Sequence, residues 1–133
     1  MTKELSFQTS NKRQLLNITS EIQKAVAESK VQDGICLVFA PHATAAIILN
    51  EDEDGLKSDI ENLVETWIPE GNWKHNQIDD NATAHLASSF IGQSKTIPIV
   101  DGKLKLGPWQ EIFLLELDGP RPNRKVVVTC LTA

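Results

Sequence analysis

The chain has 133 residues, which is the length of one ordinary domain and is enough to bury a single hydrophobic core. Hydrophobic residues make up 41% of it and charged residues 23%, proportions that exclude fibrous, disordered and disulfide-scaffold classes. The net charge of −5 argues against nucleic acid as a partner, and no apolar run approaches the ~18 residues that a membrane span requires.

Two cysteines, Cys36 and Cys130, each lie within an apolar run. No secretory signal stands at the start of the sequence, so we expect a cytoplasmic protein in a reducing compartment. We therefore expect both thiols to be reduced and to pack as small hydrophobic side chains rather than to form a disulfide.

The first part of the chain shows apolar patterns of both strands and helices. Ser20 and Gln23 stand at the spacing of a capping box, so a helix is predicted there, ending before the turn at Asp33-Gly34. Apolar residues at helical spacing predict an amphipathic helix over 56–67, with an acidic run at its positive N-terminal end. Strands are predicted, in chain order, at 5–7, 15–18, 35–40 and 45–49.

The second part is predicted to be richer in strands. Residues 69–80 lack periodicity and predict a loop, after which Asn81 is the expected N-cap of a helix over 82–91. Asp101-Gly102 is typical of a hairpin turn. Further strands are predicted at 96–100, 104–106, 111–117 and 125–131. With no helix between these closing strands, the order β-β-α-β-β-α-α-β-β-β predicts one α+β domain over 1–133 with a largely antiparallel sheet.

Three histidines lie at junctions between predicted elements: His42 after a strand, His75 in the loop and His85 near a helix start. Taken singly, each is most simply a surface or core residue. Strand ends and helix starts cluster at one rim of a sheet, so the three can also converge, and imidazole is a good ligand for zinc. The helix dipole at His85 favours the neutral, metal-binding form.

Carboxylates form two further candidate groups. Glu51 follows a buried strand and Asp59 borders the apolar helix face, while most of the acidic run between them is explained as helix-start charge. Asp118 and Arg121 flank a Gly-Pro turn. They form either an ordinary turn salt bridge or a phosphate site, since a guanidinium can bind phosphate through two hydrogen bonds.

Trp109 follows two turn residues and is either a core aromatic or the wall of a pocket. Its neighbour Gln110 is expected to direct its side-chain amide inward. No glycine-rich phosphate loop, P-loop or nucleophile elbow is present. The sequence therefore does not support ATP-driven or serine-hydrolase chemistry.

A series of short motifs follows in order along the chain. They are Pro41-His42-Ala43-Thr44-Ala45-Ala46, Asn50-Glu51, Asp59, His75, Asn81-Ala82-Thr83-Ala84-His85-Leu86, Asp101-Gly102-Lys103-Leu104, Leu106-Gly107-Pro108-Trp109-Gln110 and Glu116-Leu117-Asp118-Gly119-Pro120-Arg121. Over nearly the whole chain, their order and spacing resemble the secondary thiamine-phosphate synthase family, also called YjbQ-like proteins. The sequence departs from that family at Ala43 and Pro108, where threonine is usual.

The resemblance implies an α+β domain that assembles as a homotrimer, with sheets packed around the threefold axis. It implies that His42, His75 and His85 converge in a pocket for a divalent metal, zinc in the first place and magnesium in the second. Glu51 and Asp59 are then the expected catalytic carboxylates, acting as a base or orienting a histidine. The residues expected to line the site of a small phosphorylated substrate are Thr44, Asn50, Asn81, Gln110, Asp118 and Arg121.

The family name implies an activity, the joining of a thiazole phosphate to a pyrimidine pyrophosphate with release of pyrophosphate. The leaving group needs cationic stabilisation, which Arg121, Arg124, Lys74 and a metal can supply. A three-histidine zinc site is more typical of water activation. Two alternatives therefore stand beside the synthase: a metal-dependent hydrolase of a small phosphorylated substrate, and a non-catalytic metal-binding trimer.

Overall fold

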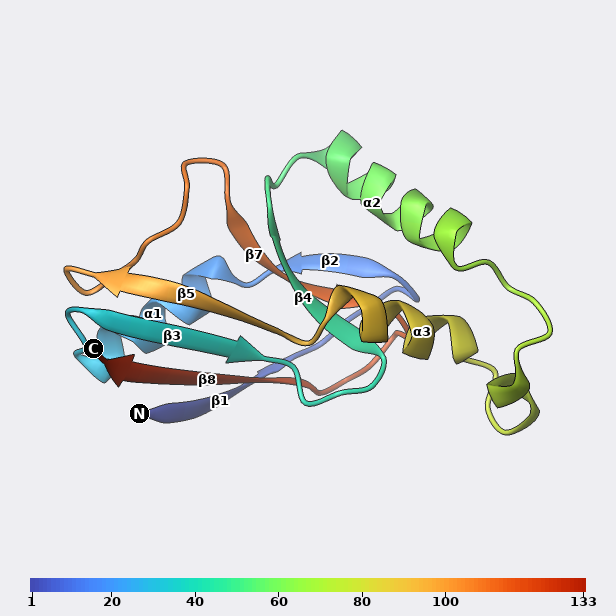
Figure 1. The fold of residues 1–133 in the computed structure, drawn as a ribbon, viewed down its shortest axis with the longest axis horizontal. Helices are drawn as coiled ribbons and strands as arrows, with labels where there is room; N and C mark the ends of the chain where they lie inside the picture. The colour runs from blue at the N-terminus through green and yellow to red at the C-terminus, as the bar shows by residue number, and fades with distance from the viewer.

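The computed structural model describes all 133 residues and contains two antiparallel sheets (Figure 1). The strands are β1 (Thr2–Phe7), β2 (Gln14–Asn17), β3 (Gly34–Phe39), β4 (Ala45–Asn50), β5 (Ser94–Val100), β6 (Lys103–Leu104), β7 (Glu111–Glu116) and β8 (Arg124–Thr132). The helices are α1 (Thr19–Ser29), α2 (Asp54–Trp67) and α3 (Ala82–Ile91), with a short 3-10 helix, η1 (Lys74–Gln77). The larger sheet has the order β1-β8-β3-β5-β6 and the smaller one β2-β7-β4.

The smaller sheet is the middle layer of the molecule, because side chains of its central strand β7 enter two separate cores. Ile112 and Leu114 pack in the first core, between the two sheets and α1. Phe113 and Leu115 alternate with them and pack in the second core, against α2 and α3. A strand buried on both faces carries a continuous apolar run, which is what the sequence shows over β7.

The predicted fold class is confirmed: the chain is a single α+β domain with three helices and antiparallel sheets. Cys36 and Cys130 are free and buried, opposite each other on β3 and β8. Burial, together with the nearby Cys130 thiol, raises the pKa of Cys36 to about 12, so this thiol stays protonated. None of the helices combines the length and apolarity that crossing a bilayer requires.

Three local predictions at element ends were wrong. The predicted strand over 104–106 is shortened to β6, and the predicted loop over 69–80 contains η1. The capping box at Ser20 and Gln23 does not form, because Ser20 lies inside α1 and the Gln23 amide oxygen accepts from the Leu104 N–H at 3.0 Å. Tertiary hydrogen bonding thus replaces the local cap.

The apolar face of α2 is only partly covered. Val64 is the single buried residue of this helix, whereas Leu63 and Trp67 are 66% and 56% exposed. Trp67 meets Phe90 of α3 edge-to-face, with ring centroids 5.7 Å apart. The helical spacing is as predicted, but within one chain the apolar face remains largely open.

A pair of isoleucine substitutions tests this division between core and surface. Ile47→Ala removes a fully buried side chain from β4 and is expected to lower the free energy of unfolding by about 2–5 kcal/mol. Ile78→Ala, at a position 86% exposed, is the matched control and is expected to change it by less than about 0.5 kcal/mol. Urea denaturation followed by tryptophan fluorescence measures the free energy of unfolding of both variants. Equal losses would contradict the assignment of Ile47 to the core and Ile78 to the surface.

Candidate functional site

A buried ion pair joins the ends of β7 and β8. Glu116 is 0% exposed and Arg124 is 5% exposed, and the Arg124 Nε–H donates to both Glu116 carboxylate oxygens at 3.0 and 2.9 Å. Two charges are buried here without loss of hydrogen bonding, since no buried polar side-chain atom in the structure lacks a partner.

The same ion pair holds the segments that carry the candidate site. Glu116 accepts a 2.6 Å hydrogen bond from the Thr9 hydroxyl and further bonds from the backbone N–H groups of Leu117 and Asp118. Arg124 donates to the Thr44 carbonyl and hydroxyl oxygens at 3.1 and 2.9 Å. Thr44, an expected substrate contact, therefore uses its hydroxyl within the chain.

Beyond β7, a chain of hydrogen bonds runs from a guanidinium to an imidazole. Asp118 Oδ2 accepts from Arg121 Nη2 at 2.9 Å and from the Asn81 amide at 2.8 Å. Because the amide nitrogen of Asn81 donates to Asp118, its oxygen faces His75 Nε2 at 3.0 Å. Asn81 is the N-cap residue of α3, as the sequence predicted, but its side chain makes no capping bond and instead joins Asp118 to His75.

This hydrogen-bond chain fixes the tautomer of His75. The amide oxygen of Asn81 only accepts, so His75 carries its proton on Nε2 and keeps the Nδ1 lone pair free. His85 lies beside it, with ring centroids 4.4 Å apart in an edge-to-face arrangement. The two histidines line a cavity of about 260 Å³ together with Trp73, Lys74, Ala82 and Leu86. The structure thus brings together His75, His85, Asn81, Asp118 and Arg121.

His42 is held in a different way. Its Nε2 accepts a 2.8 Å hydrogen bond from the backbone N–H of Lys125. Burial lowers the pKa of His42, and the nearby Arg124 guanidinium lowers it further. His42 is therefore stabilised in its neutral form.

The predicted three-histidine zinc site does not fit this arrangement. A neutral imidazole has a single lone pair, and the one on His42 is engaged by the Lys125 amide. No group of three or more His, Cys, Asp or Glu side chains is arranged to hold a metal ion. His75 and His85 remain as a pair of imidazoles without a third histidine ligand.

Other predicted site residues lie at the far end of β4. His42 precedes this strand and Glu51 follows it, so the length of β4, roughly 17 Å at about 3.3 Å per residue, separates them. Glu51 lines a cavity of about 230 Å³ with Trp109, which is 71% exposed. Asp59 is exposed on α2.

Two amide side chains at this far end close local turns. Asn50 accepts from the Glu51 N–H at 2.8 Å, and Gln110 accepts from the Gly107 N–H at 2.8 Å. The inward orientation predicted for Gln110 is therefore wrong. Within one chain, the expected catalytic carboxylates and these amides are not joined to the histidines.

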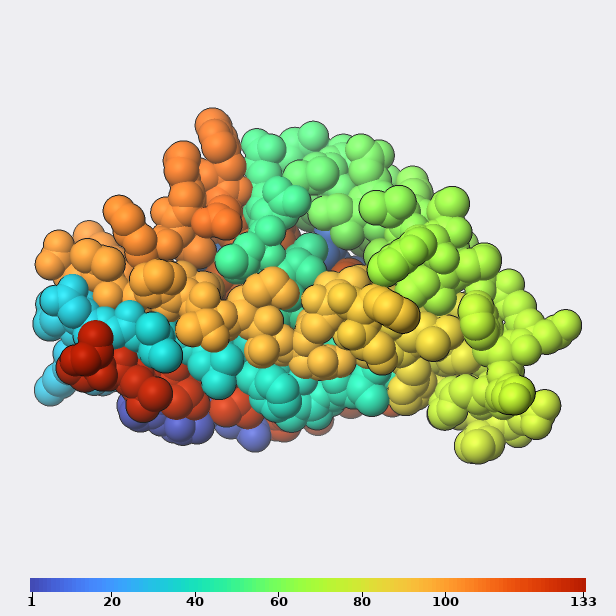
Figure 2. Space-filling model, viewed as in Figure 1, coloured from blue at the N-terminus to red at the C-terminus, as the bar shows by residue number.

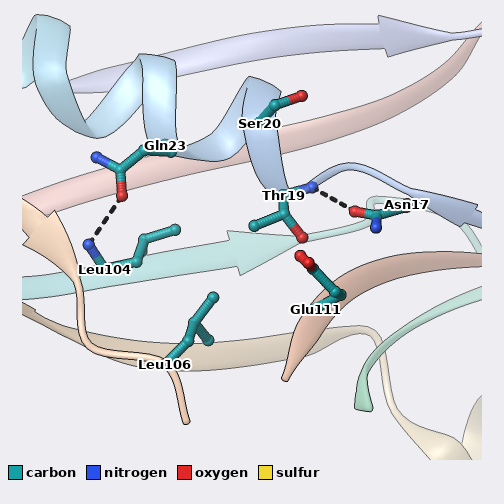
Figure 3. Close-up of a pocket in the computed structure, with 7 residues that line it drawn as sticks. All are labelled: Asn17, Thr19, Ser20, Gln23, Leu104, Leu106 and Glu111. Atoms are coloured by element: carbon teal, nitrogen blue, oxygen red, sulfur yellow. Dashed lines mark hydrogen bonds between the residues drawn. The ribbon is translucent and has the colours of Figure 1, made fainter. Parts of the chain in front are cut away.

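A larger cavity of about 430 Å³ lies at the start of α1 (Figure 3). Three of its polar side chains already bond to the backbone. Asn17 accepts from the Thr19 N–H at 3.0 Å, and the Thr19 hydroxyl accepts from the Ile112 N–H at 2.8 Å. Gln23 likewise binds Leu104. These bonds fasten α1 to the strands, so the histidine region remains the candidate site.

Sequence reasoning did not identify the central role of Glu116 and Arg124. The only signal is their position, a carboxylate ending one apolar strand and a guanidinium beginning another. The Thr9 hydroxyl accepts a hydrogen bond from the Arg121 backbone N–H at 2.9 Å. Nothing in the sequence around Thr9 indicates this contact.

Comparison with known proteins agrees with the α+β fold described above. The profile of a family described as UPF0047 protein YjbQ-like matches residues 3–133. A UPF0047 protein from Methanothermobacter thermautotrophicus is 43% identical to the chain, over 96% of this chain and 90% of its own length. The UPF0047 protein YugU from Bacillus subtilis is 34% identical, over 91% of this chain and 92% of its own length.

Two crystal structures share the whole fold. A YbjQ-like protein from Sulfolobus solfataricus superposes with a TM-score of 0.98 at 42% identity, covering 100% of this chain and 97% of that one. APE1520 from Aeropyrum pernix superposes with a TM-score of 0.96 at 38% identity, covering 100% and 99%. The chain belongs to the YjbQ-like, UPF0047 family.

Breaking the central ion pair is expected to be costly. Arg124→Met leaves the Glu116 carboxylate buried without its partner, which should lower the free energy of unfolding by about 3–5 kcal/mol. Lys125→Met, the matched control one residue along β8, removes an exposed ion pair with Glu4 and should cost less than about 1 kcal/mol. Chemical denaturation measures both variants, and similar small losses would show that the pair is not central.

Proposed function

We propose that the chain is an enzyme acting on a small phosphorylated or pyrophosphorylated substrate at the His75–His85 cavity. The reaction to assay first is the formation of thiamine phosphate from a thiazole phosphate and a pyrimidine pyrophosphate. The observation that carries the proposal is the hydrogen-bond chain Arg121–Asp118–Asn81–His75, which couples a guanidinium to an imidazole with a defined tautomer.

The histidine end of this chain supports acid–base chemistry. Asn81 holds the His75 ring through Nε2, which leaves Nδ1 free to accept a proton and return it. The Asp118 carboxylate orients the Asn81 amide, so that the ring is positioned before any substrate binds. Once Nδ1 has taken a proton from solvent, such a histidine can transfer that proton to the oxygen of a departing pyrophosphate.

The arginine end supports binding of phosphate. Arg121 uses Nε and Nη2 within the chain, at 2.9 Å each to the Asp118 carbonyl and carboxylate oxygens, and Nη1 has no partner there. Lys74 lines the histidine cavity and adds a second positive charge. Lys74 in the cavity and Arg121 at the far end of the hydrogen-bond chain are two cations that suit a leaving group with growing negative charge.

In this proposal the predicted divalent metal is bound by the substrate and not by the histidines. Pyrophosphate commonly reacts as its magnesium complex, so magnesium is supplied in the assay as part of the substrate. Hydrolysis of a phosphorylated substrate is the alternative that the same histidine base would support, with water in place of the thiazole.

Replacing the arginine should weaken the reaction. We expect Arg121→Ala to lower kcat/KM for thiamine phosphate formation by about 10- to 100-fold, because a hydrogen bond to a charged group is worth about 1.5–3 kcal/mol. Lys103→Ala, which removes a charge from the β5–β6 hairpin, is the control and should leave the rate unchanged. Liquid chromatography of the products measures both.

The assay also separates the alternatives. Phosphate release without thiamine phosphate would favour the hydrolase. No turnover with magnesium, zinc or manganese supplied would contradict an enzymatic role and leave the non-catalytic trimer.

We also propose that three copies assemble through the outer face of the larger sheet. A sheet with one solvated face normally carries polar residues there, but Ile35, Phe39 and Leu131 are 43%, 39% and 54% exposed on this face. Figure 2 views this side of the molecule, with β3 in cyan and β8 in red at the surface. An apolar sheet face of this kind is typical of a protein interface.

An acidic substitution tests the assembly. The wild-type chain should sediment at about three times its 14.7 kDa mass, and Phe39→Asp should sediment as a single chain because it places a charge within the interface. Phe90→Asp, at a position 72% exposed on α3, is the matched control and should remain trimeric. Monomeric wild-type protein, or a trimeric Phe39→Asp variant, would contradict this interface.

A further inference from the structure

We propose that His42 binds an anionic oxygen of the substrate as a neutral hydrogen-bond donor, through Nδ1–H, and does not ligate a metal. The identity of the anion as a substrate rests on the proposed function. The tautomer of the His42 ring does not, because it follows from contacts within the chain.

The tautomer follows from one hydrogen bond. The backbone N–H of Lys125 can only donate, so His42 Nε2, 2.8 Å away, must accept with its lone pair. In a neutral imidazole the other nitrogen then carries the proton. A metal on Nδ1 would force that proton onto Nε2, where two N–H donors would face each other.

The position of the Lys125 amide is determined by the larger sheet. Pairing between β3 and β8 ends at Phe39 and Val127, so on this edge of β8 no residue of β3 lies opposite Lys125, whereas Ser6 of β1 lies opposite it on the other edge. The His42 ring fills this place and satisfies the donor. An unpaired amide would be costly in a half-buried position, and this cost holds the ring in place.

Both ends of that hydrogen bond are anchored to the central ion pair. Arg124 precedes Lys125 in β8, and its guanidinium donates to Thr44, two residues after His42. Arg124 is in turn held by Glu116. The ring and the amide are thus fixed by the same buried pair, so the Nδ1–H direction is set before a ligand arrives.

The proton on Nδ1 is available to a ligand. Nδ1 has no partner in the chain, and because no buried polar side-chain atom is left unpartnered, it is open to solvent. Arg121 contributes a weak positive charge in the same region, the smallest of the influences that lower the pKa of His42. A neutral N–H donor in a region of positive charge suits a phosphate oxygen.

The state of the ring can be read directly by nuclear magnetic resonance. In protein carrying ¹⁵N-labelled histidine, at about pH 8, which is above the ordinary pKa of an imidazole, the His42 signals should show a proton on Nδ1 and none on Nε2. His42→Gln identifies these signals by their loss. Added zinc should leave them in place. A proton on Nε2, or a zinc-induced shift of the His42 nitrogens, would overturn the proposal.

Two substitutions test the donor. His42→Leu removes both hydrogen bonds and should weaken binding of magnesium pyrophosphate at least about 10-fold, whereas His42→Gln can accept from Lys125 and donate to the anion and should weaken it less than about 3-fold. Isothermal titration calorimetry measures both. Equal losses in the two variants, or no loss in His42→Leu, would overturn the role as a donor.

The two proposals fail separately. If His42→Leu does not fold, the tautomer in the wild-type chain still decides the question. If the tautomer and pyrophosphate results are as expected but no reaction is catalysed, the proposed enzyme is wrong and the donor role of His42 stands.

Discussion

The ion pair between Glu116 and Arg124 is the constraint on which the rest of the structure depends. Two opposite charges are withdrawn from water at the ends of β7 and β8, and their desolvation is offset because no buried polar side-chain atom lacks a hydrogen-bond partner. The partners come from three segments of the chain, around Thr9, Thr44 and Leu117, so the pair fixes how the two sheets meet. Loops that carry chemistry need a rigid frame of this kind.

The two sides of that frame prepare histidines in opposite states. Asn81, oriented by Asp118, leaves His75 with a free lone pair on Nδ1. The Lys125 amide leaves His42 with a proton on Nδ1. A base and a donor on one scaffold are complementary groups for a reaction that moves a proton and binds a charged oxygen. Neither state is an intrinsic property of histidine, since each is set by the hydrogen bond that the other ring nitrogen makes.

Much of the fold could be predicted because it depends on local pattern. The apolar run of β7 and the helical spacing of α2 are readable from neighbouring residues. The misjudged side chains, Gln23, Asn81 and Gln110, are amides whose partners belong to other segments or to the adjacent turn. An amide can cap, bridge or close a turn with equal ease, and only the available partners decide which it does.

The candidate site divides in the same way. The motif resemblance identified His75, Asn81, Asp118 and Arg121, and the structure connects them. The resemblance also placed Glu51 in the same site, but strand β4 separates Glu51 from His42. The order of motifs along a chain does not show how far apart they lie in space.

By itself, the sequence determined the fold class, the free cysteines and the family, since patterning and motif order are properties of the chain alone. Only the tertiary structure decided which charges pair and which histidine nitrogen keeps its proton. Those outcomes depend on contacts such as Glu116 with Arg124 and His42 with Lys125. In both pairs, burial makes an unpaired donor or charge too costly to leave.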